Sequence, residues 1–165
     1  MTFFHNKHMR LGNFSYEWRN HFFITICTAY RNQIFGEVVD KKMRLSDCGK
    51  IAEVCWCEIP DHHQKISIDE YIIMPDHMHG ILCLDTVDNR HAYYLNQKPQ
   101  HNRLSVIVGS FKSAVAKKIR MSHPDLFPIW QKSFHDRLIR SNIEMEKIRD
   151  YIKKNPGKFD NNSDL

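Results

Sequence analysis

The sequence lacks several features that define common classes of protein. No apolar run approaches the ~20 residues needed to cross a bilayer, so no membrane-spanning helix is expected. The first residues contain neither a continuous apolar stretch nor a cleavage pattern, which argues against a signal peptide. Internal repeats and low-complexity segments are also absent. The chain length and the hydrophobic content of 42% suit a single domain over residues 1–165.

Paired cysteine spacing is missing as well. The five cysteines are an odd number, and none forms a Cys-x-x-Cys pair, so neither a disulfide framework nor a structural zinc site is expected. We interpret them as reduced, mostly buried thiols of a cytoplasmic protein. They are Cys27, Cys48, Cys55, Cys57 and Cys83.

Basic residues are scarce in the first half of the chain and abundant in the second. Residues 37–97 hold six Lys or Arg against eleven Asp or Glu, a balance of −5. Residues 98–158 hold fourteen against five, a balance of +9. A basic half suits a polyanionic partner such as nucleic acid, although solvated helix faces also collect lysine.

Hydrophobic periodicity predicts an α+β fold. The order of elements is β-α-β-β-α-β followed by a helix, which matches a ferredoxin-like antiparallel sheet covered by helices. Strands are predicted over 21–30, 66–74, 77–84 and 133–140. Helices are predicted over 46–59, around 104–119, and from 141 to the residues before Pro156. The polar stretch over 85–102 is predicted to be a flexible surface loop.

Each predicted helix has an apolar stripe that should face the sheet. In the first helix the stripe is Ile51, Val54, Cys55 and Ile59, with Pro60 just beyond the end. In the second it is Leu104, Ile107, Val108, Phe111, Val115 and Ile119, with Ser113, Lys117 and Arg120 on the outer face. In the last it is Met145, Ile148 and Ile152.

The triplet His77-Met78-His79 lies in an extended, apolar segment. Side chains at i and i+2 of a strand leave the same face, so the two histidines should point together while Met78 points into a core. Two convergent neutral imidazoles are a ready pair of ligands for a divalent metal ion. Taken alone, the pair also fits two histidines with purely structural roles.

The last predicted helix carries a second candidate pair. Ser141 and Glu144 fit a capping box, and Pro156 with Gly157 is a stop signal. Tyr151 and Asn155 are four residues apart, so they share a helix face. The tyrosine is a candidate nucleophile and the asparagine oxygen a candidate metal ligand, although packing and helix termination are the ordinary roles of such residues.

In combination, these motifs resemble the REP-associated tyrosine transposases, a branch of the single-tyrosine HUH transposases related to small bacterial insertion sequences. The resemblance runs in order from about residue 10 to 159, and its specific elements are the His-Met-His triplet and Tyr-x-x-x-Asn-Pro. The matching segments are 22–28, 34–37, 70–81, 109–113, 130–131, 134–136 and 150–156.

The resemblance implies the same fold and assigns the site residues. His77 and His79 would hold the metal, Tyr151 on the C-terminal helix would be the nucleophile, and Asn155 would be the third ligand. The insertion-sequence relatives commonly have glutamine at that last position. Imidazole and amide ligands suit Mg²⁺ or Mn²⁺ better than structural zinc. We therefore expect these three ligands to converge beside the Tyr151 hydroxyl.

The implied activity is metal-dependent nicking and rejoining of single-stranded or hairpin DNA through a covalent 5′-phosphotyrosine. The protein would act as a monomer in cis, or as a homodimer in which Tyr151 serves a partner's histidines. No membrane partner is expected. The candidate DNA contacts are Lys112, Lys117, Arg120, Arg137, Arg140, Lys153 and Lys154.

Two readings from other classes are open. A ferredoxin-like sheet can be a non-catalytic RNA-binding module, for which Phe22, Phe23 and Tyr71 would be the stacking residues. Alternatively, the two histidines and a carboxylate such as Asp76 or Asp136 would make a hydrolytic metal site that uses water. Only the transposase forms a covalent adduct with DNA.

Overall fold

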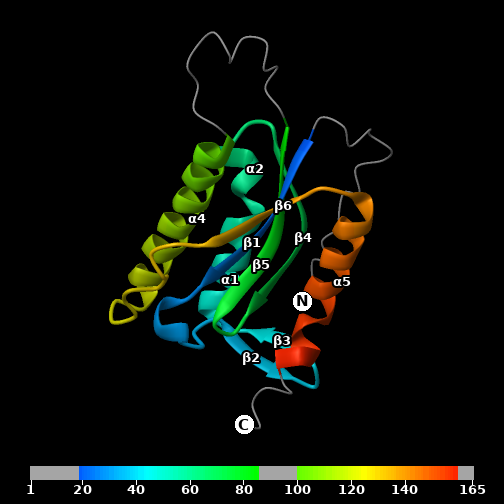
Figure 1. Cartoon of the computed structure of the whole chain (residues 1–165). Coiled ribbons are helices and arrows are strands. Elements are labelled where there is room, and N and C mark those ends of the chain that lie inside the picture. The colour runs from blue at the N-terminus through cyan, green and yellow to red at the C-terminus, as the bar shows by residue number, and fades with distance from the viewer. Residues whose placement is uncertain (1–18, 86–99, 160–165) are drawn as a thin grey trace.

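The computed structural model describes residues 19–85 and 100–159, and within them the main sheet has four antiparallel strands (Figure 1). The strands are β1 (Arg19–Cys27), β4 (Ile66–Met74), β5 (His77–Asp85) and β6 (His135–Ile139). Their order in the sheet is β4–β5–β1–β6. With helices between the strands, this order is the ferredoxin-like α+β arrangement predicted from the sequence.

The three predicted helices are present in the predicted order, as α1 (Asp47–Cys57), α4 (Gln100–Ser122) and α5 (Asn142–Phe159). The described residues also form two short helices that were not predicted, η2 (Ala29–Arg31) and α2 (Ile59–His62). A hairpin of β2 (Gly36–Val39) and β3 (Lys42–Leu45) is an addition that the periodicity did not predict. Its turn residues Asp40 and Lys41 have φ of 50° and 59°, the left-handed pair that a two-residue hairpin turn requires.

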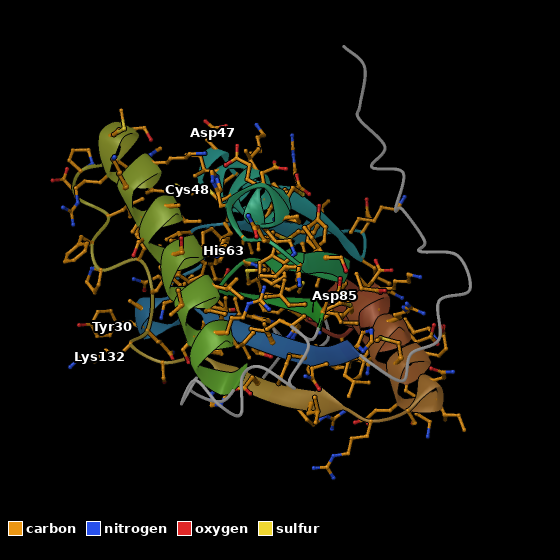
Figure 2. The ribbon with its side chains drawn as sticks, turned by 90° about the horizontal axis from the view of Figure 1, so that it is seen from above. Tyr30, Asp47, Cys48, His63, Asp85 and Lys132 are labelled. Carbon is orange, nitrogen blue, oxygen red and sulfur yellow. The ribbon has the colours of Figure 1, made fainter. Side chains whose placement is uncertain are left out.

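The sheet separates two cores because side chains alternate along its central strands. Phe22, Ile24 and Ile26 of β1 face α1 and α4 in the larger core. Ile81 and Cys83 of β5 face the other side, where α5 covers the sheet. Figure 2 shows the molecule from above, with α4 and α5 on opposite sides of the sheet. All six apolar positions predicted for the second helix are buried in the larger core.

The predicted buried stripe of α1 is partly wrong. Val54 is 49% exposed, whereas Ala52 and Trp56 are fully buried. A tertiary contact explains the difference. The Trp56 ring lies directly against Gly80 of β5, which has no side chain to exclude it. The bulkiest residue therefore sets the rotation of the helix. Pro60 lies in the first turn of α2, a position that proline tolerates.

Two predicted boundaries are also wrong. The first strand ends at Cys27 instead of continuing to residue 30, and η2 follows it. The last helix does not stop at Pro156 but continues to Phe159. A proline inside a helix removes one backbone hydrogen bond, but here Asn155 and Pro156 are buried, so packing favours the helical path.

The predicted loop over 85–102 falls mainly on residues 86–99, which lie outside the described residues. Asp85 still belongs to β5, and α4 has begun by Gln100. In the described part of the chain, none of the helices combines the length and apolarity needed to cross a membrane.

Gly80→Ala should destabilise the protein. A Cβ at this position would lie 2.3 Å from Cζ2 of the buried Trp56, so the ring or the strand must move. We expect the free energy of unfolding to fall by about 1–3 kcal/mol in urea denaturation followed by circular dichroism. Gly109→Ala on α4 is the matched control, because its Cβ meets nothing within 4 Å and should not destabilise. Equal losses in the two variants would contradict the packing argument.

Candidate active site

The two histidines of the triplet lie together on the face of the sheet covered by α5. His77 and His79 are both buried, and their ring centroids are 4.7 Å apart. Met78 between them is buried in the opposite core, with α1 and α4. The strand alternation predicted from the sequence is therefore confirmed, and it turns both imidazoles toward one helix.

Each imidazole has a hydrogen-bond partner on its Nδ1 atom. Asp76 Oδ1 lies 2.6 Å from His77 Nδ1, and Thr25 Oγ1 lies 2.8 Å from His79 Nδ1. Thr25 is the direct antiparallel partner of His79 across β1 and β5, so the strand register brings them together. Partners on both Nδ1 atoms leave the Nε2 atoms as the nitrogens available to bind a ligand.

Tyr151 of α5 reaches the histidine pair of its own chain. Its hydroxyl lies 3.4 Å from His79 Nε2, and the two ring centroids are 5.3 Å apart. Phe23 stacks on the His79 ring and meets the Tyr151 ring edge-on. Tyr151 is 38% exposed, so one part of the side chain is packed while the rest reaches the surface.

Asn155 lies on the same face of α5 and is buried. It is four residues after Tyr151, whose ring contacts His79, and four before Phe159, whose ring centroid is 6.3 Å from that of His77. A helix places residues four apart on one face, so Asn155 lies between the segments of α5 that contact the two histidines. Its convergence with the histidines on one point stays a prediction.

Helix α5 is held over the sheet by apolar and ionic contacts. The predicted stripe of Met145, Ile148 and Ile152 is buried, as expected. Ser141 accepts a hydrogen bond from the Glu144 amide, as the capping box predicted. The Arg149 guanidinium binds both carboxylate oxygens of Asp69 on β4, at 2.7 and 2.5 Å.

Burial keeps the His79 imidazole neutral. Desolvation, followed by the nearby charges of His77 and Arg31, lowers the pKa of His79 from 6.5 to about 3. Burial alone would raise the pKa of the Asp76 carboxyl, but the His77 hydrogen bond and charge, with Arg31, outweigh it and hold that pKa below its usual range. The site therefore contains a neutral His79 imidazole and an ionised Asp76 carboxylate, and the carboxylate is hydrogen-bonded to His77.

Among residues 19–85 and 100–159, no group of three His, Cys, Asp or Glu side chains could hold a metal ion. A metal site with three protein ligands at the histidine pair would therefore need a ligand of another type. The buried amide of Asn155 is the candidate that the sequence supplies.

Sequence reasoning missed several residues around the site. Phe23 and Thr25 lie on the site face of β1, and their alternation with buried Phe22 and Ile24 was the available signal. Lys158, whose Nζ lies 5.0 Å from the centroid of the Tyr151 ring, was missed because the helix was predicted to end before it.

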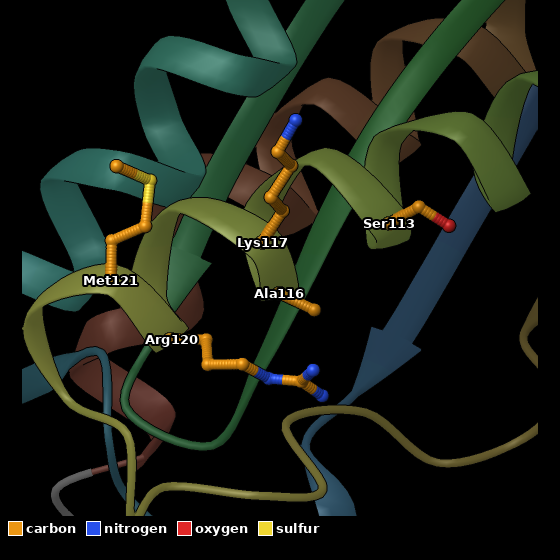
Figure 3. A pocket seen from close by; sticks show the side chains of 5 residues that line it. All are labelled: Ser113, Ala116, Lys117, Arg120 and Met121. Carbon is orange, nitrogen blue, oxygen red and sulfur yellow. The ribbon is translucent and has the colours of Figure 1, made fainter.

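The candidate DNA contacts are divided between the two sides of the sheet. Lys112, Lys117 and Arg120 lie on α4, away from the histidines. Lys112 donates to the backbone oxygens of Gln131, Lys132 and Ser133, so its ammonium group already holds a loop. Lys117 and Arg120 line a depression of about 420 Å³ with Ser113, Ala116 and Met121 (Figure 3).

The other candidates lie on the side of α5 or at the sheet edge. Arg137 pairs with Phe23 across β1 and β6, and its guanidinium lies 3.1 Å from Glu144. Lys153 bridges to Glu70, and Lys154 bridges to Asp150. Arg140 is exposed and lies two residues before the start of α5. This group is on the side of the sheet that carries the histidines and Tyr151.

The aromatic residues considered for an RNA-binding sheet are not on an open surface. Phe22 is buried in the larger core. Phe23 packs against His79 and Tyr151, and Tyr71 packs against Trp56. Helices cover both faces of the sheet, so a stacking platform of these three residues is not available.

The chain resembles known proteins both in sequence and in structure. The chain is 31% identical over 160 residues to an uncharacterized protein of Haemophilus influenzae, with 92% of this chain and 88% of that protein covered. No family model matches the chain.

Two of the solved structures that share the fold do so at low sequence identity. A REP-associated tyrosine transposase bound to a REP hairpin superposes with a TM-score of 0.56 and 19% identity, over 89% of this chain and 72% of that one. A candidate transposase from Deinococcus radiodurans R1 superposes with a TM-score of 0.53 and 16% identity, over 86% and 94% of the two chains. The fold implied by the sequence resemblance is therefore confirmed.

The metal-free protein should lose stability in mild acid because of His79. Its pKa is about 3 in the folded chain against 6.5 for the unperturbed group, so below pH 6.5 only the unfolded chain gains the proton. Stability therefore falls as the pH drops from 6.5 toward 3. Between pH 7 and 5 this residue should remove about 2 kcal/mol from the free energy of unfolding, measured by urea denaturation in EDTA. His79→Gln should lack this component, and an unchanged pH dependence in that variant would contradict the assignment.

Proposed function

The chain belongs to the family of its Haemophilus influenzae relative and has the fold of a REP-associated tyrosine transposase, and on this premise we propose that it nicks and rejoins single-stranded DNA. The reaction depends on a divalent metal, proceeds through a covalent 5′-phosphotyrosine, and acts on repeated hairpin-forming elements. The solved transposase bound to a REP hairpin supports DNA of this kind as the partner.

The observation that carries the proposal is the contact between Tyr151 and His79. The hydroxyl and Nε2 are 3.4 Å apart within one chain, although 72 residues separate them in sequence. A tyrosine that served only to pack would not need its hydroxyl at the nitrogen left free by the Thr25 hydrogen bond. The contact supports action in cis, in which each chain uses its own nucleophile.

The residues of the site fit Mg²⁺ or Mn²⁺. His77 and His79 would hold the ion through Nε2, and Asn155 would complete the protein ligands with its amide oxygen. A neutral His79, with its lone pair on Nε2, is the form that binds metal. When bound, the ion supplies positive charge for the non-bridging oxygens of the phosphate under attack.

Tyr151 supplies the nucleophile for a step that conserves the phosphodiester energy. Its phenolic oxygen forms a bond to phosphorus while the bond from phosphorus to the 3′ oxygen breaks. The phenol loses its proton to solvent, and the departing 3′ oxygen takes one up. The DNA then carries a free 3′-hydroxyl, and the 5′-phosphate stays on Tyr151 until another 3′-hydroxyl attacks and reverses the exchange.

The DNA strand would follow the basic residues on the side of α5. Arg137 is adjacent to Phe23, which packs against both His79 and Tyr151. Its guanidinium is well exposed despite the Glu144 contact, so it can exchange that partner for a phosphate. Lys117 and Arg120 face away from the site and would contact only a longer, folded part of the DNA.

Tyr151→Phe should abolish strand cleavage while leaving fold and DNA affinity nearly unchanged. Only the hydroxyl is lost, and the ring still packs against Phe23 and His79. The assay mixes end-labelled single-stranded DNA carrying a hairpin with protein and Mn²⁺, and it follows label on a denaturing protein gel. Wild type should form a labelled adduct, and the variant should form none.

Tyr30→Phe is the matched control, because Tyr30 is an exposed tyrosine that makes no proposed contact with the substrate. It should form the adduct at the wild-type rate. An adduct on Tyr151→Phe would overturn the choice of nucleophile. Cleavage by wild type with no adduct at any time point would instead favour the hydrolase that uses water.

DNA binding should weaken steeply with salt. Phosphate contacts release counterions, so the logarithm of the binding constant should fall linearly with the logarithm of salt concentration in fluorescence anisotropy titrations. Arg137→Ala should weaken binding and reduce this slope by about one. Lys50→Ala, which removes an exposed charge paired with Asp47 in the acidic half, should change neither quantity. A slope near zero for wild type would exclude a phosphate-dominated interface.

A further inference from the structure

We propose that Arg31 and Asp76 form a positioning pair that fixes which nitrogen of His77 faces the metal, an inference that rests on the metal site of the proposed function. Neither residue is a ligand in that site. Their task is to make Nδ1 of His77 the nitrogen that donates to Asp76, so that Nε2 is the nitrogen that would face the metal.

Asp76 is held from three directions. It is buried, with Oδ1 at 2.6 Å from His77 Nδ1 and Oδ2 at 2.9 Å from Arg31 Nε. Its backbone oxygen accepts hydrogen bonds from both the amide and the hydroxyl of Thr28, each at 2.9 Å. The carboxylate therefore has one orientation, with one oxygen for each partner.

The backbone that carries Arg31 is strained. Tyr30 and Arg31 have φ of 55° and 57°, in the left-handed region that residues with a side chain seldom occupy. Packing of Tyr30 does not explain this, because its side chain is 83% exposed and points outward at the edge of the molecule (Figure 2). What the conformation achieves is the approach of Arg31 to Asp76, with a second contact from Nη1 to Cys27 Sγ at 2.9 Å.

The chemistry of the three groups allows one hydrogen-bond pattern. A guanidinium only donates, and an ionised carboxylate only accepts. The Nδ1 atom of His77 must therefore carry the hydrogen that points at Asp76, and the Nε2 atom of a neutral ring must carry the lone pair. Arg31 supports this pattern, because it holds the second carboxylate oxygen and so keeps the first one directed at His77.

Asp76→Asn tests this pattern because an amide is both donor and acceptor. Arg31 cannot give up its proton, so it should take the amide oxygen and leave the NH₂ group facing His77. The imidazole can move its proton, so Nδ1 becomes the acceptor and Nε2 becomes protonated. We expect Mn²⁺ affinity to fall by about 10–100-fold.

Removing Arg31 from this variant should restore much of the affinity. In Arg31→Met/Asp76→Asn the amide is free to turn its oxygen toward His77, so the Nδ1 proton and the free Nε2 return. A residue with only a structural role would give the opposite result, because a second substitution would add to the damage. Arg31 is half-exposed, so the loss of the carboxylate charge in Asp76→Asn leaves no buried unpaired charge, and both variants should fold.

The experiment measures Mn²⁺ binding to the full chain without DNA, by electron paramagnetic resonance of the free ion. Nitrogen-15 NMR of the histidine rings, recorded on the metal-free protein, reports the tautomer of His77 directly. Glu37→Gln is the control, because it removes a carboxylate paired with Arg44 in the β2–β3 hairpin. That variant should bind Mn²⁺ like wild type.

The expected result is a shift of the His77 proton from Nδ1 to Nε2 in Asp76→Asn, with weaker Mn²⁺ binding, and reversal of both in the double variant. If Asp76→Asn keeps the wild-type Mn²⁺ affinity and the wild-type tautomer of His77, this inference is wrong while the proposed function still stands. Weaker binding in the double variant than in Asp76→Asn would also overturn it. A wild-type chain that does not bind Mn²⁺ would overturn the metal site of the proposed function, and this inference with it.

Discussion

The antiparallel register between β1 and β5 is the constraint on which the rest of the structure depends. It sets Thr25 opposite His79 and Cys27 opposite His77. A shift by one residue would turn every side chain of β5 to the other face, which would bury the histidines among apolar groups and expose Met78 to α5. Gly80 and Trp56 help to exclude that shift, because only glycine leaves room for the indole on that face of β5.

The same register connects stability with the candidate site. The larger core, which contains Trp56 and Met78, holds the strand in place from one side of the sheet. The other side is then free to carry polar groups, each satisfied by a specific partner such as Thr25 or Asp76. A buried imidazole without such a partner would be costly, so the hydrogen bonds that orient the histidines also make their burial acceptable.

Helix α5 brings Tyr151 to the two histidines, and long-range contacts of two kinds hold the helix there. Its apolar stripe sets its rotation, and the paired hydrogen bonds from Arg149 to Asp69 set its position along the sheet. Asp69 lies where the pairing of β4 with β5 is irregular, between Ile68 and Tyr71. The ion pair therefore fastens the helix at a point where the strand departs from regular geometry, and Tyr151 follows two residues later on that helix.

Local patterns in the sequence were sufficient for the order of the four main strands and three main helices, for the buried face of α4, for the capping box and for the common direction of His77 and His79. These features depend on periodicity and on side chains close in the chain, which a sequence displays directly. Tertiary structure alone decided the rotation of α1, because the Trp56 ring responds to a glycine on a distant strand. It also decided the continuation of α5 through Pro156, where burial outweighs a lost backbone hydrogen bond. The partners of the two Nδ1 atoms, the strained approach of Arg31 and the contact of Tyr151 with its own chain's His79 likewise depend on strand register and helix docking, which join residues far apart in the sequence.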